Sequence, residues 1–319
     1  MTTMNKKILV TGGAGYIGSA AAQALIKQGE SVVVFDDLSH GQQDKVPPQA
    51  LFIQGDVTDT AALAKVFNEH EFSAVLHFAA RKSVEESESE PTAYFRTNVT
   101  GTLNLLEQMV QHGVSKLVFS SSAAVYAPDA TLTSFSEDAT TAPINIYGQT
   151  KLMAEDIIKS YARTGQLPEY AILRYFNVAG DAGLSYVEQD AKNIFPLLVR
   201  ALREEQTFKI FGTDYPTPDG TCVRDYIHLS DLVAAHVAAL SRAGSGTYNL
   251  GTQNGYSVRQ LIAAFEEVSG RRLTIEEAPR RAGDPAALLA DASKAKEELG
   301  WQPEKTLKDM VESMLVTYN

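Results

Sequence analysis

The strongest constraint on this chain is a glycine-rich segment near its start. The apolar run Ile8–Thr11, typical of a short buried strand, leads directly into Gly12-Gly13-Ala14-Gly15-Tyr16-Ile17-Gly18, where a helix is expected to begin. In this spacing Gly12 forms a tight turn, Gly15 lets the backbone approach a pyrophosphate, and Gly18 lets the helix pack closely on the strand. A flexible turn explains many isolated matches to such a pattern, but here a strand precedes it and a helix follows. The segment therefore predicts a dinucleotide-binding site.

A carboxylate follows the second expected strand. Strand Ser31–Phe35 ends at Asp36, 18 residues after Gly18. A carboxylate at this place accepts hydrogen bonds from an adenosine ribose and repels a 2′-phosphate, which favours NAD over NADP. The alternative is that Asp36 only caps a loop.

Strands and helices alternate along the first half of the chain. The expected strands are Ile8–Thr11, Ser31–Phe35, Leu51–Ile53, Ala74–Phe78, Lys116–Ser120 and Ala171–Phe176, and the expected helices run from about Ile17 to Gln28, Pro91 to Gly113, Tyr147 to Arg163 and Asp231 to Arg242. This alternation predicts an α/β fold with a doubly wound parallel sheet of the Rossmann type.

The regular alternation stops after Phe176. A polar stretch, Asp181–Lys192, precedes a helix near Asn193–Glu204, and a further strand is expected at Thr247–Gly251. Ser257 and Gln260 match a capping box for a helix that ends at Gly270. We therefore expect a smaller, irregular α/β substrate domain from about 177–224 and 252–319, and an NAD-binding domain from 1–176 plus about 225–251.

A second constellation follows the fifth expected strand. Tyr147 and Lys151 are four residues apart on an expected helix and so share one face, while Ser122 lies at the end of the preceding strand. A neighbouring lysine cation, together with a nicotinamide cation, would lower the phenol pKa towards the neutral range and make Tyr147 an acid/base group. The alternative is an ordinary surface tyrosine and lysine.

Composition excludes several other classes of protein. Lys and Arg number 28 against 39 Asp and Glu, and the resulting net charge of −11 argues against a binder of nucleic-acid backbones. The one cysteine, Cys222, cannot form an intramolecular disulfide, and the six scattered histidines include no pair at metal-ligand spacing, so no metal is expected. With no apolar run long enough to span a membrane and no signal segment, we expect a cytoplasmic protein.

These residues resemble the extended short-chain dehydrogenase/reductase family and, within it, the UDP-glucose 4-epimerases. The resemblance covers nearly the whole chain, through the segments Thr11–Gly18, Phe35–Gly41, His77–Lys82, Asn98–Thr102, Ser120–Tyr126, Tyr147–Lys151, Leu173–Val178, Asp214–His228 and Arg280–Asp284. The stretch Tyr215–His228 is the one most similar to epimerases.

The resemblance implies roles for individual residues. It implies NAD binding by Gly12, Gly15, Tyr16, Ile17, Gly18, Asp36, Asp37, Asp56, Val57, Phe78, Ala79, Ala80, Lys82, Asn98, Ser122, Tyr147, Lys151 and Phe176. For the UDP-hexose it implies Ser122, Tyr147, Asn177, Asn193, Phe211, Arg224, Arg281 and Asp284. Arginine suits a diphosphate because its planar fork pairs with oxyanions at two points, although Arg224 and Arg281 could instead form surface ion pairs with Asp225 and Asp284.

The implied reaction inverts C4 of a UDP-hexose through a 4-keto intermediate, with Ser122, Tyr147 and Lys151 as catalytic residues. It would place the protein in galactose metabolism as an isomerase, and the family also suggests a homodimer through the helices near Pro91–Gly113 and Tyr147–Arg163.

Five places depart from the family pattern. Asp37 stands in place of Asn, Arg81 in place of Leu and Ala124 in place of Thr, and segment Gly180–Lys192 lacks the usual loop. Leu288 stands where some members carry Tyr; this smaller side chain should enlarge the sugar pocket, so that N-acetylated hexoses are accepted too.

Other activities stay open. A 4,6-dehydratase needs an extra acid and base beside Ser122, whereas Ala123-Ala124-Val125 follow here. A uronate 4-epimerase or a decarboxylase would use the same oxidation at C4 and differ mainly in how C6 is recognised. A non-catalytic NAD-binding sensor is a further alternative, but it has no need of the Ser, Tyr and Lys set.

Overall fold

The computed structural model describes residues 6–127, 134–188, 193–242, 244–281 and 284–317. By its internal contacts the chain divides into two compact units. The first unit comprises Met1–Ala127, Ala139–Arg174 and Val233–Tyr248, and the second comprises Pro128–Asp138, Tyr175–Leu232 and Asn249–Asn319. The chain thus leaves the first unit twice, after Ala127 and after Arg174, and returns to it at Ala139 and at Val233.

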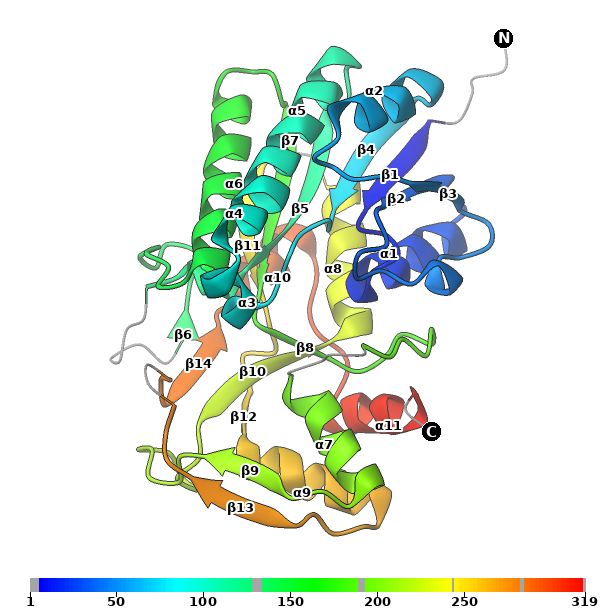
Figure 1. Ribbon diagram of the computed structural model, residues 1–319. Helices are drawn as coiled ribbons and strands as arrows, with labels where there is room; N and C mark the ends of the chain where they lie inside the picture. Colours follow the sequence, from blue (N-terminus) through cyan, green and yellow to red (C-terminus); the bar gives the residue numbers. More distant parts are fainter. Residues whose placement is uncertain (1–5, 128–133, 189–192, 243, 282–283, 318–319) are drawn as a thin grey trace. The chain divides into compact units, whose positions relative to one another are not determined.

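The first unit is built on a seven-stranded sheet with helices packed on it (Figure 1). Its elements are β1 (Lys7–Thr11), α1 (Tyr16–Lys27), β2 (Val32–Asp36), η1 (Gln43–Lys45), β3 (Leu51–Gln54), α2 (Thr60–Glu69), β4 (Phe72–His77), α3 (Val84–Ser89), α4 (Pro91–Tyr94), the π-helical turn η2 (Phe95–Thr100), α5 (Gly101–Gln111), β5 (Lys116–Ser122), the 3-10 turn η3 (Ala123–Val125), α6 (Ile146–Arg163), β7 (Glu169–Tyr175), α8 (Leu229–Ser241) and β11 (Gly246–Leu250).

The strand order of this sheet is β11-β7-β5-β4-β1-β2-β3. Strand β1 pairs in parallel with both β2 and β4, so the chain order reverses on either side of it. In open α/β sheets ligands bind beyond the carboxyl ends of the strands at such a reversal. The glycine-rich segment follows β1 directly, and the predicted doubly wound α/β fold is confirmed.

Successive side chains of each strand point to opposite faces of the sheet, as strand geometry requires. One face buries a core made by α2, α5 and α6 together with the strands, containing Leu63, Leu105, Met109, Ala154 and Ile158 from these helices. The strand residues between those that enter this core face the other side, where α1 contacts β1 and β2. Strands buried on both faces explain the uninterrupted apolar runs in the sequence.

Three helices end at the glycines that the sequence predicted as their ends. Gly29, Gly113 and Gly270 have φ angles of +87°, +66° and +67°, which only glycine adopts without strain. The single helix expected from Pro91 to Gly113 is instead divided into α4 and α5 by the π-helical turn η2.

The second unit contains short strands and helices, as the loss of regular alternation predicted. Its elements are β6 (Ser134–Phe135), β8 (Asn177–Ala179), α7 (Ile194–Glu204), β9 (Phe208–Phe211), β10 (Val223–His228), β12 (Gly255–Ser257), α9 (Val258–Ser269), β13 (Ile275–Ala278), β14 (Ala287–Ala290), α10 (Ser293–Leu299) and α11 (Leu307–Thr317). Strand β10 is central: it pairs with β8, β12 and β14. The predicted capping box of Ser257 and Gln260 is present at the start of α9.

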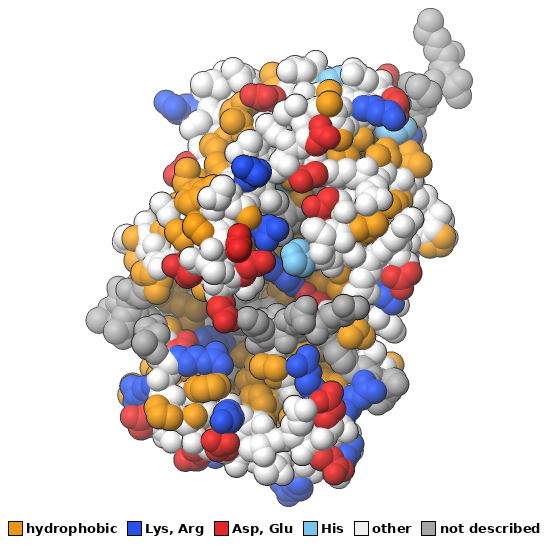
Figure 2. Space-filling model, in the orientation of Figure 1, with side chains coloured by type: hydrophobic (Ala, Val, Ile, Leu, Met, Phe, Trp, Pro, Cys, Tyr) orange, Lys and Arg blue, Asp and Glu red, His pale blue; other side chains and the backbone are white. Residues whose placement is uncertain are grey.

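The surface carries charges of both signs. On the face shown in Figure 2, acidic and basic side chains of the described residues are interspersed. Within the part of the chain that the structure describes, no helix combines the length and the apolar character that crossing a bilayer would require.

Candidate active site

The turn after β1 is closed too tightly for side chains at its glycines. A Cβ atom at Gly18 would lie 2.1 Å from the carbonyl oxygen of Gly12, and one at Gly12 would lie 2.5 Å from the Ala79 backbone nitrogen. Gly15 is the N-cap of α1 and provides no side-chain cap. The first amides of α1 therefore have no side-chain acceptor at the cap position, which suits the phosphate oxygens of a dinucleotide.

The carboxylate of Asp36 lies beside this turn. It is 7% exposed and accepts hydrogen bonds from the backbone amides of Ala14 (3.0 Å) and Leu38 (2.8 Å), one on each oxygen. Burial raises its pKa, and these two bonds oppose the rise. Since a carboxylate oxygen has two lone pairs, each oxygen can also accept from a ribose hydroxyl. The residues of the turn thus fit a dinucleotide.

The neighbouring predicted contacts are less direct. Asp37 accepts from the amide and the hydroxyl of Ser39, and Asp56 accepts from the amide of Thr58, so both carboxylates stabilise turns. The Val57 side chain is buried in the core of the first unit. A contact from Val57 to a cofactor would therefore come from its backbone.

Hydrogen bonds from neighbouring elements fix the end of β4 and the segment that follows it. The His77 ring is hydrogen bonded to Thr11 (2.7 Å) and Thr102 (2.9 Å), and burial lowers its pKa to about 3, which keeps the ring neutral. The Asn98 carboxamide accepts from the backbone amide of Arg81 (2.8 Å) and donates to the carbonyl oxygen of Arg81 (3.0 Å) and to the Thr150 hydroxyl (2.9 Å). Asn98 thereby connects the predicted cofactor segment Phe78–Lys82 to α6.

The three predicted catalytic residues meet at the carboxyl end of β5. Tyr147 and Lys151 lie on one face of α6, and Lys151 Nζ donates to the carbonyl oxygen of Ser120 (2.9 Å). Ser122 is the last residue of β5, and its hydroxyl also interacts with the Tyr147 phenol. Tyr147 is 9% and Lys151 4% exposed, whereas Ser122 is half-buried. The residues of the first unit therefore form a hydroxyl, phenol and ammonium cluster.

Burial controls the proton affinities in this cluster. It raises the pKa of the Tyr147 phenol, and the interaction with Ser122 opposes that rise. It also lowers the pKa of Lys151 to about 8, while the Glu155 carboxylate opposes the fall. Among the protein residues alone, desolvation of the Tyr147 phenol thus outweighs the Ser122 hydrogen bond, and the predicted lowering of its pKa, which includes a nicotinamide cation, stays a prediction.

Helix α3 fixes the start of α6, the helix of Tyr147 and Lys151, through a contact that the sequence did not predict. The Glu88 carboxylate accepts from the Ile146 amide (2.9 Å), the Ser87 hydroxyl accepts from the Tyr147 amide (3.1 Å), and Asn145 caps the Gly148 amide (2.8 Å). These bonds satisfy amides in the first turn of α6 that have no partner within the helix. Only the Asn145 cap was readable from the sequence.

In the second unit, the predicted UDP contacts form two pairs. Arg224 Nη2 lies 2.8 Å from Asp284 Oδ1, and the Arg224 side chain is 13% exposed. The Arg281 guanidinium lies over the Phe211 ring, 4.2 Å from its centre. Arg224 is therefore in an ion pair, although with Asp284 and largely buried rather than at the surface, and Arg281 makes a cation–π contact.

Two further predicted residues, Asn177 and Leu288, lie on strands that pair with β10. Asn177 in β8 donates to the backbone oxygen of Asp225 (2.9 Å), and Leu288 in β14 is directly opposite Arg224 in the strand register. Phe176 is half-buried between β7 and β8, and Asn193 is the exposed N-cap of α7. Arg224, Asp284 and Leu288 thus belong to one region of the second unit.

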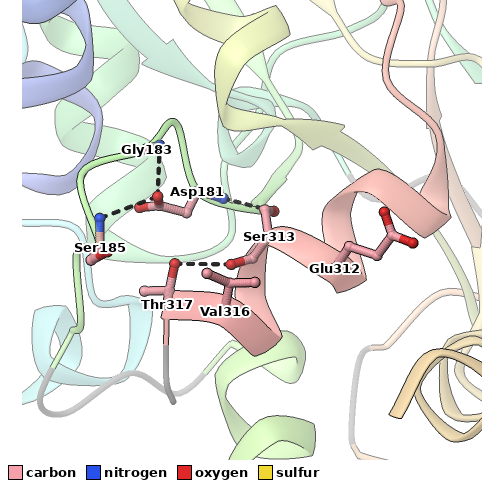
Figure 3. A pocket seen from close by; sticks show the side chains of 7 residues that line it. All are labelled: Asp181, Gly183, Ser185, Glu312, Ser313, Val316 and Thr317. Carbon is pink, nitrogen blue, oxygen red and sulfur yellow. Dashed lines mark hydrogen bonds between the residues drawn. The ribbon is translucent and has the colours of Figure 1, made fainter. Parts of the chain in front are cut away.

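A shallow hollow of about 280 Å³ in the second unit lies among other residues. It is lined by Asp181, Gly183, Ser185, Glu312, Ser313, Val316 and Thr317 (Figure 3). Asp181 already accepts from the amides of Gly183 and Ser185, and the Ser313 hydroxyl accepts from the Asp181 amide. No predicted site residue lines it. Among the described residues, no group of three or more His, Cys, Asp or Glu is placed to hold a metal ion.

Substitution of Gly18 by Ala tests the glycine turn. Because the new Cβ would meet the Gly12 carbonyl, the turn must shift; we expect loss of bound dinucleotide and a fall of about 1–3 kcal/mol in the free energy of unfolding. Measurement of nucleotide released from acid-denatured protein, with urea unfolding, checks this. Gly113→Ala is the control for backbone strain alone: its φ of +66° disfavours a side chain, but a Cβ there meets no atom within 4 Å, so it should lower stability and keep the dinucleotide. Full dinucleotide content in Gly18→Ala would contradict the assignment.

Comparison with known proteins agrees with this geometry. Residues 8–251 match the model of the NAD dependent epimerase/dehydratase family, and the chain belongs to that family. It is 47% identical, over 96% of its length and 94% of the relative's, to the UDP-glucose 4-epimerase of Corynebacterium glutamicum.

Solved structures of similar proteins contain the expected ligands. One is a UDP-glucose 4-epimerase from Brucella ovis in complex with NAD, with a TM-score of 0.94, 37% identity and 98% coverage of both chains. Another is a UDP-glucose 4-epimerase from Bifidobacterium longum in complex with NAD⁺ and UDP, with a TM-score of 0.87, 38% identity and 97% coverage of both chains. The predicted family resemblance is confirmed.

Proposed function

We propose that this protein is an NAD-dependent isomerase that interconverts UDP-glucose and UDP-galactose by inverting C4 of the hexose. The observation that carries the proposal is the meeting of Ser122, Tyr147 and Lys151 at the end of β5, in the unit that also holds the glycine turn. The similarity to UDP-glucose 4-epimerases along almost the whole chain supports it.

The first unit would hold NAD. The amides at the start of α1 face the pyrophosphate in this assignment, and Asp36 binds the adenosine ribose. A 2′-phosphate would be repelled by the Asp36 carboxylate, which accounts for NAD rather than NADP. Bound NAD supplies the acceptor and donor for the C4 hydrogen.

The chain's own residues move the proton. Tyr147 takes the proton from the 4-hydroxyl as the 4-keto sugar forms and returns it to the inverted alcohol. The phenol needs help to ionise, since burial raises its pKa. The Ser122 hydroxyl and the Lys151 cation provide that help, and Ser122 can also donate to the sugar oxygen.

The second unit would hold UDP. Arg224 and Arg281 suit the diphosphate through their planar donor forks, and Phe211 offers a ring to the uracil. For Arg224 this requires that the diphosphate replace or join Asp284 as its partner. Binding energy concentrated on the UDP leaves the sugar free to turn over between the two halves of the reaction.

Incubation with UDP-galactose tests the function. The purified protein, without added NAD, should convert UDP-galactose to UDP-glucose, because the cofactor is regenerated in each turnover and has no need to leave. Mass spectrometry of the products separates the alternatives: loss of water indicates a dehydratase, and loss of carbon dioxide from a UDP-uronate a decarboxylase. Bound NAD without any conversion would favour a sensor.

Leu288 bears on the sugar that is accepted. It lies opposite Arg224 in the strand register, and its smaller side chain should leave room for an N-acetyl group. We expect Leu288→Tyr to lower the rate on UDP-N-acetylgalactosamine relative to UDP-galactose. Leu289→Tyr, at the next position of β14, is the matched control. An unchanged ratio of the two rates would remove the role of Leu288.

The proposal extends to assembly and location. Val110 in α5 is 36% and Met153 in α6 39% exposed, which is compatible with a homodimer through these helices. Sedimentation velocity of the purified protein distinguishes a dimer from a monomer. A cytoplasmic location is proposed from the sequence features alone.

A further inference from the structure

Glu155 continues the line of catalytic residues on α6. Tyr147, Lys151 and Glu155 are spaced four residues apart and therefore lie on one face of the helix. The Glu155 side chain is 0% exposed. A carboxylate so fully buried is costly unless its oxygens are bonded and its charge is paired.

The partners of Glu155 lie on β5, β7 and its own helix. Its Oε1 accepts from the Ser121 hydroxyl (2.6 Å) and from Arg174 Nε (2.9 Å), and its Oε2 accepts from Arg174 Nη2 (2.6 Å) and Lys159 Nζ (3.1 Å). The contact with Arg174 is two-pronged, and Arg174 is itself 3% exposed. This is a closed, charge-assisted network of the strong kind.

The network spans the segment that carries the catalytic serine. Ser121 lies between Ser120, whose carbonyl accepts from Lys151, and Ser122. Arg174 reaches onward to the Tyr126 hydroxyl (3.1 Å) and lies over its ring, 5.0 Å from the centre. Glu155 and Arg174 therefore hold both ends of the Ser121–Tyr126 segment.

The network also places a negative charge, the Glu155 carboxylate, near the Lys151 ammonium. Two other groups close to Lys151 bring no negative charge: the His77 ring is neutral, and the Tyr147 phenol is protonated in the free site because burial raises its pKa. The other charged or titratable groups in this region lie around Glu155: Arg174 and Lys159 bond to it, and burial together with the carboxylate raises the pKa of Tyr170. Glu155 is the carboxylate that opposes the loss of the Lys151 proton.

We propose that Glu155 is a positioning residue of the epimerase, whose buried carboxylate holds the Ser121–Ser122 strand end against α6 and keeps Lys151 protonated. Arg174 acts with it by fixing the carboxylate between β5 and β7. This inference rests on the proposed function for the role of Lys151, but the geometry of the network stands without it.

The variant Glu155→Gln tests the proposal, because it keeps the shape and loses the charge. Without that charge Lys151 loses its proton more readily, so the alkaline limb of the kcat/KM profile for UDP-galactose should move to lower pH by about one unit. The ultraviolet absorbance of the Tyr147 phenolate should also emerge at higher pH than in the wild-type protein. The Tyr147 signal is isolated by subtracting the spectrum of the double variant Glu155→Gln/Tyr147→Phe from that of Glu155→Gln.

Controls separate charge from stability. Glu155→Gln leaves Arg174 buried without a counter-charge, which is strongly destabilising, so the double variant Glu155→Gln/Arg174→Gln removes both charges. Asp156→Asn removes a carboxylate from the exposed face of α6 and should shift neither readout. Glu155→Asp keeps the charge and should restore the profile.

The outcomes are distinct. The proposal is overturned if Glu155→Gln, or Glu155→Gln/Arg174→Gln, folds and leaves both the kcat/KM profile and the phenolate titration unshifted. Glu155 would then be only structural. If the wild-type protein fails to convert UDP-galactose, the proposed function fails. The phenolate titration then still decides whether Glu155 controls the charge of Lys151.

Discussion

Replacing Tyr147 by Phe lowers the turnover of UDP-galactose by at least about 10²-fold, the usual cost of losing a positioned acid/base group. Phe fills the same buried space, so α6 and the β5 end keep their packing, and only the hydroxyl that interacts with Ser122 is lost. UDP affinity should stay unchanged, because the predicted UDP contacts lie in the second unit.

Steady-state kinetics and calorimetric titration with UDP check this result. Tyr161→Phe is the matched control, since it makes the same chemical change on the same helix, in a residue packed against the core of the first unit. Turnover near the wild-type value in Tyr147→Phe would exclude the phenol as the group that moves the proton.

Replacing Lys151 by Met has the second largest effect expected, and it appears in the pH profile. Lys151 keeps its proton below a pKa of about 8, and its cation favours ionisation of Tyr147. Without it the phenol ionises only at higher pH, so the acid limb of the kcat/KM profile should move upward by about one unit or more. In Glu155→Gln the expected shift is instead in the alkaline limb and towards lower pH, whereas the Tyr147 phenolate should emerge at higher pH in both variants.

Rates measured from acid to alkaline pH test this shift. Lys65→Met is the control, because its ammonium lies on α2, is 72% exposed and pairs with Glu69, away from Glu155 and the end of β5. An acid limb at the wild-type position in Lys151→Met would mean that Lys151 does not influence the phenol.

The parts of the fold that depend on local chemistry could be predicted from the sequence. Apolar runs marked β1, β2, β4 and β5 because strands buried on both faces have no polar positions to alternate. Gly29, Gly113 and Gly270 marked helix ends because the chain there needs positive φ. The π-helical turn η2 could not be predicted, since the Asn98 carboxamide in it bonds to Arg81 and Thr150, which are distant in sequence.

The strands of the second unit could not be predicted from the sequence for a similar reason. Strands β9 and β13 pair with each other across more than 60 residues, as Phe208 opposite Ile275 shows, and each has only four residues. Such short strands carry too little pattern to be recognised alone. The pairing is decided by tertiary contacts that no local window contains.

The candidate catalytic residues could be predicted because helical spacing alone places Tyr147 and Lys151 on one face. The groups that support them were missed: Ser87 and Glu88 reach α6 from α3, and Arg174 reaches Glu155 from β7. Glu155 could have been noticed from its position four residues after Lys151. The raised pKa of Tyr147 could not be predicted from the sequence, because desolvation of the phenol depends on the packed structure.

The most direct test of C4 inversion by a returning hydrogen uses UDP-galactose that carries deuterium at C4. Incubated with the purified protein in ordinary water and without added NAD, it should give UDP-glucose with the deuterium still at C4, read by nuclear magnetic resonance. UDP-glucose with protium at C4, or a product altered at C6, would contradict the proposed reaction.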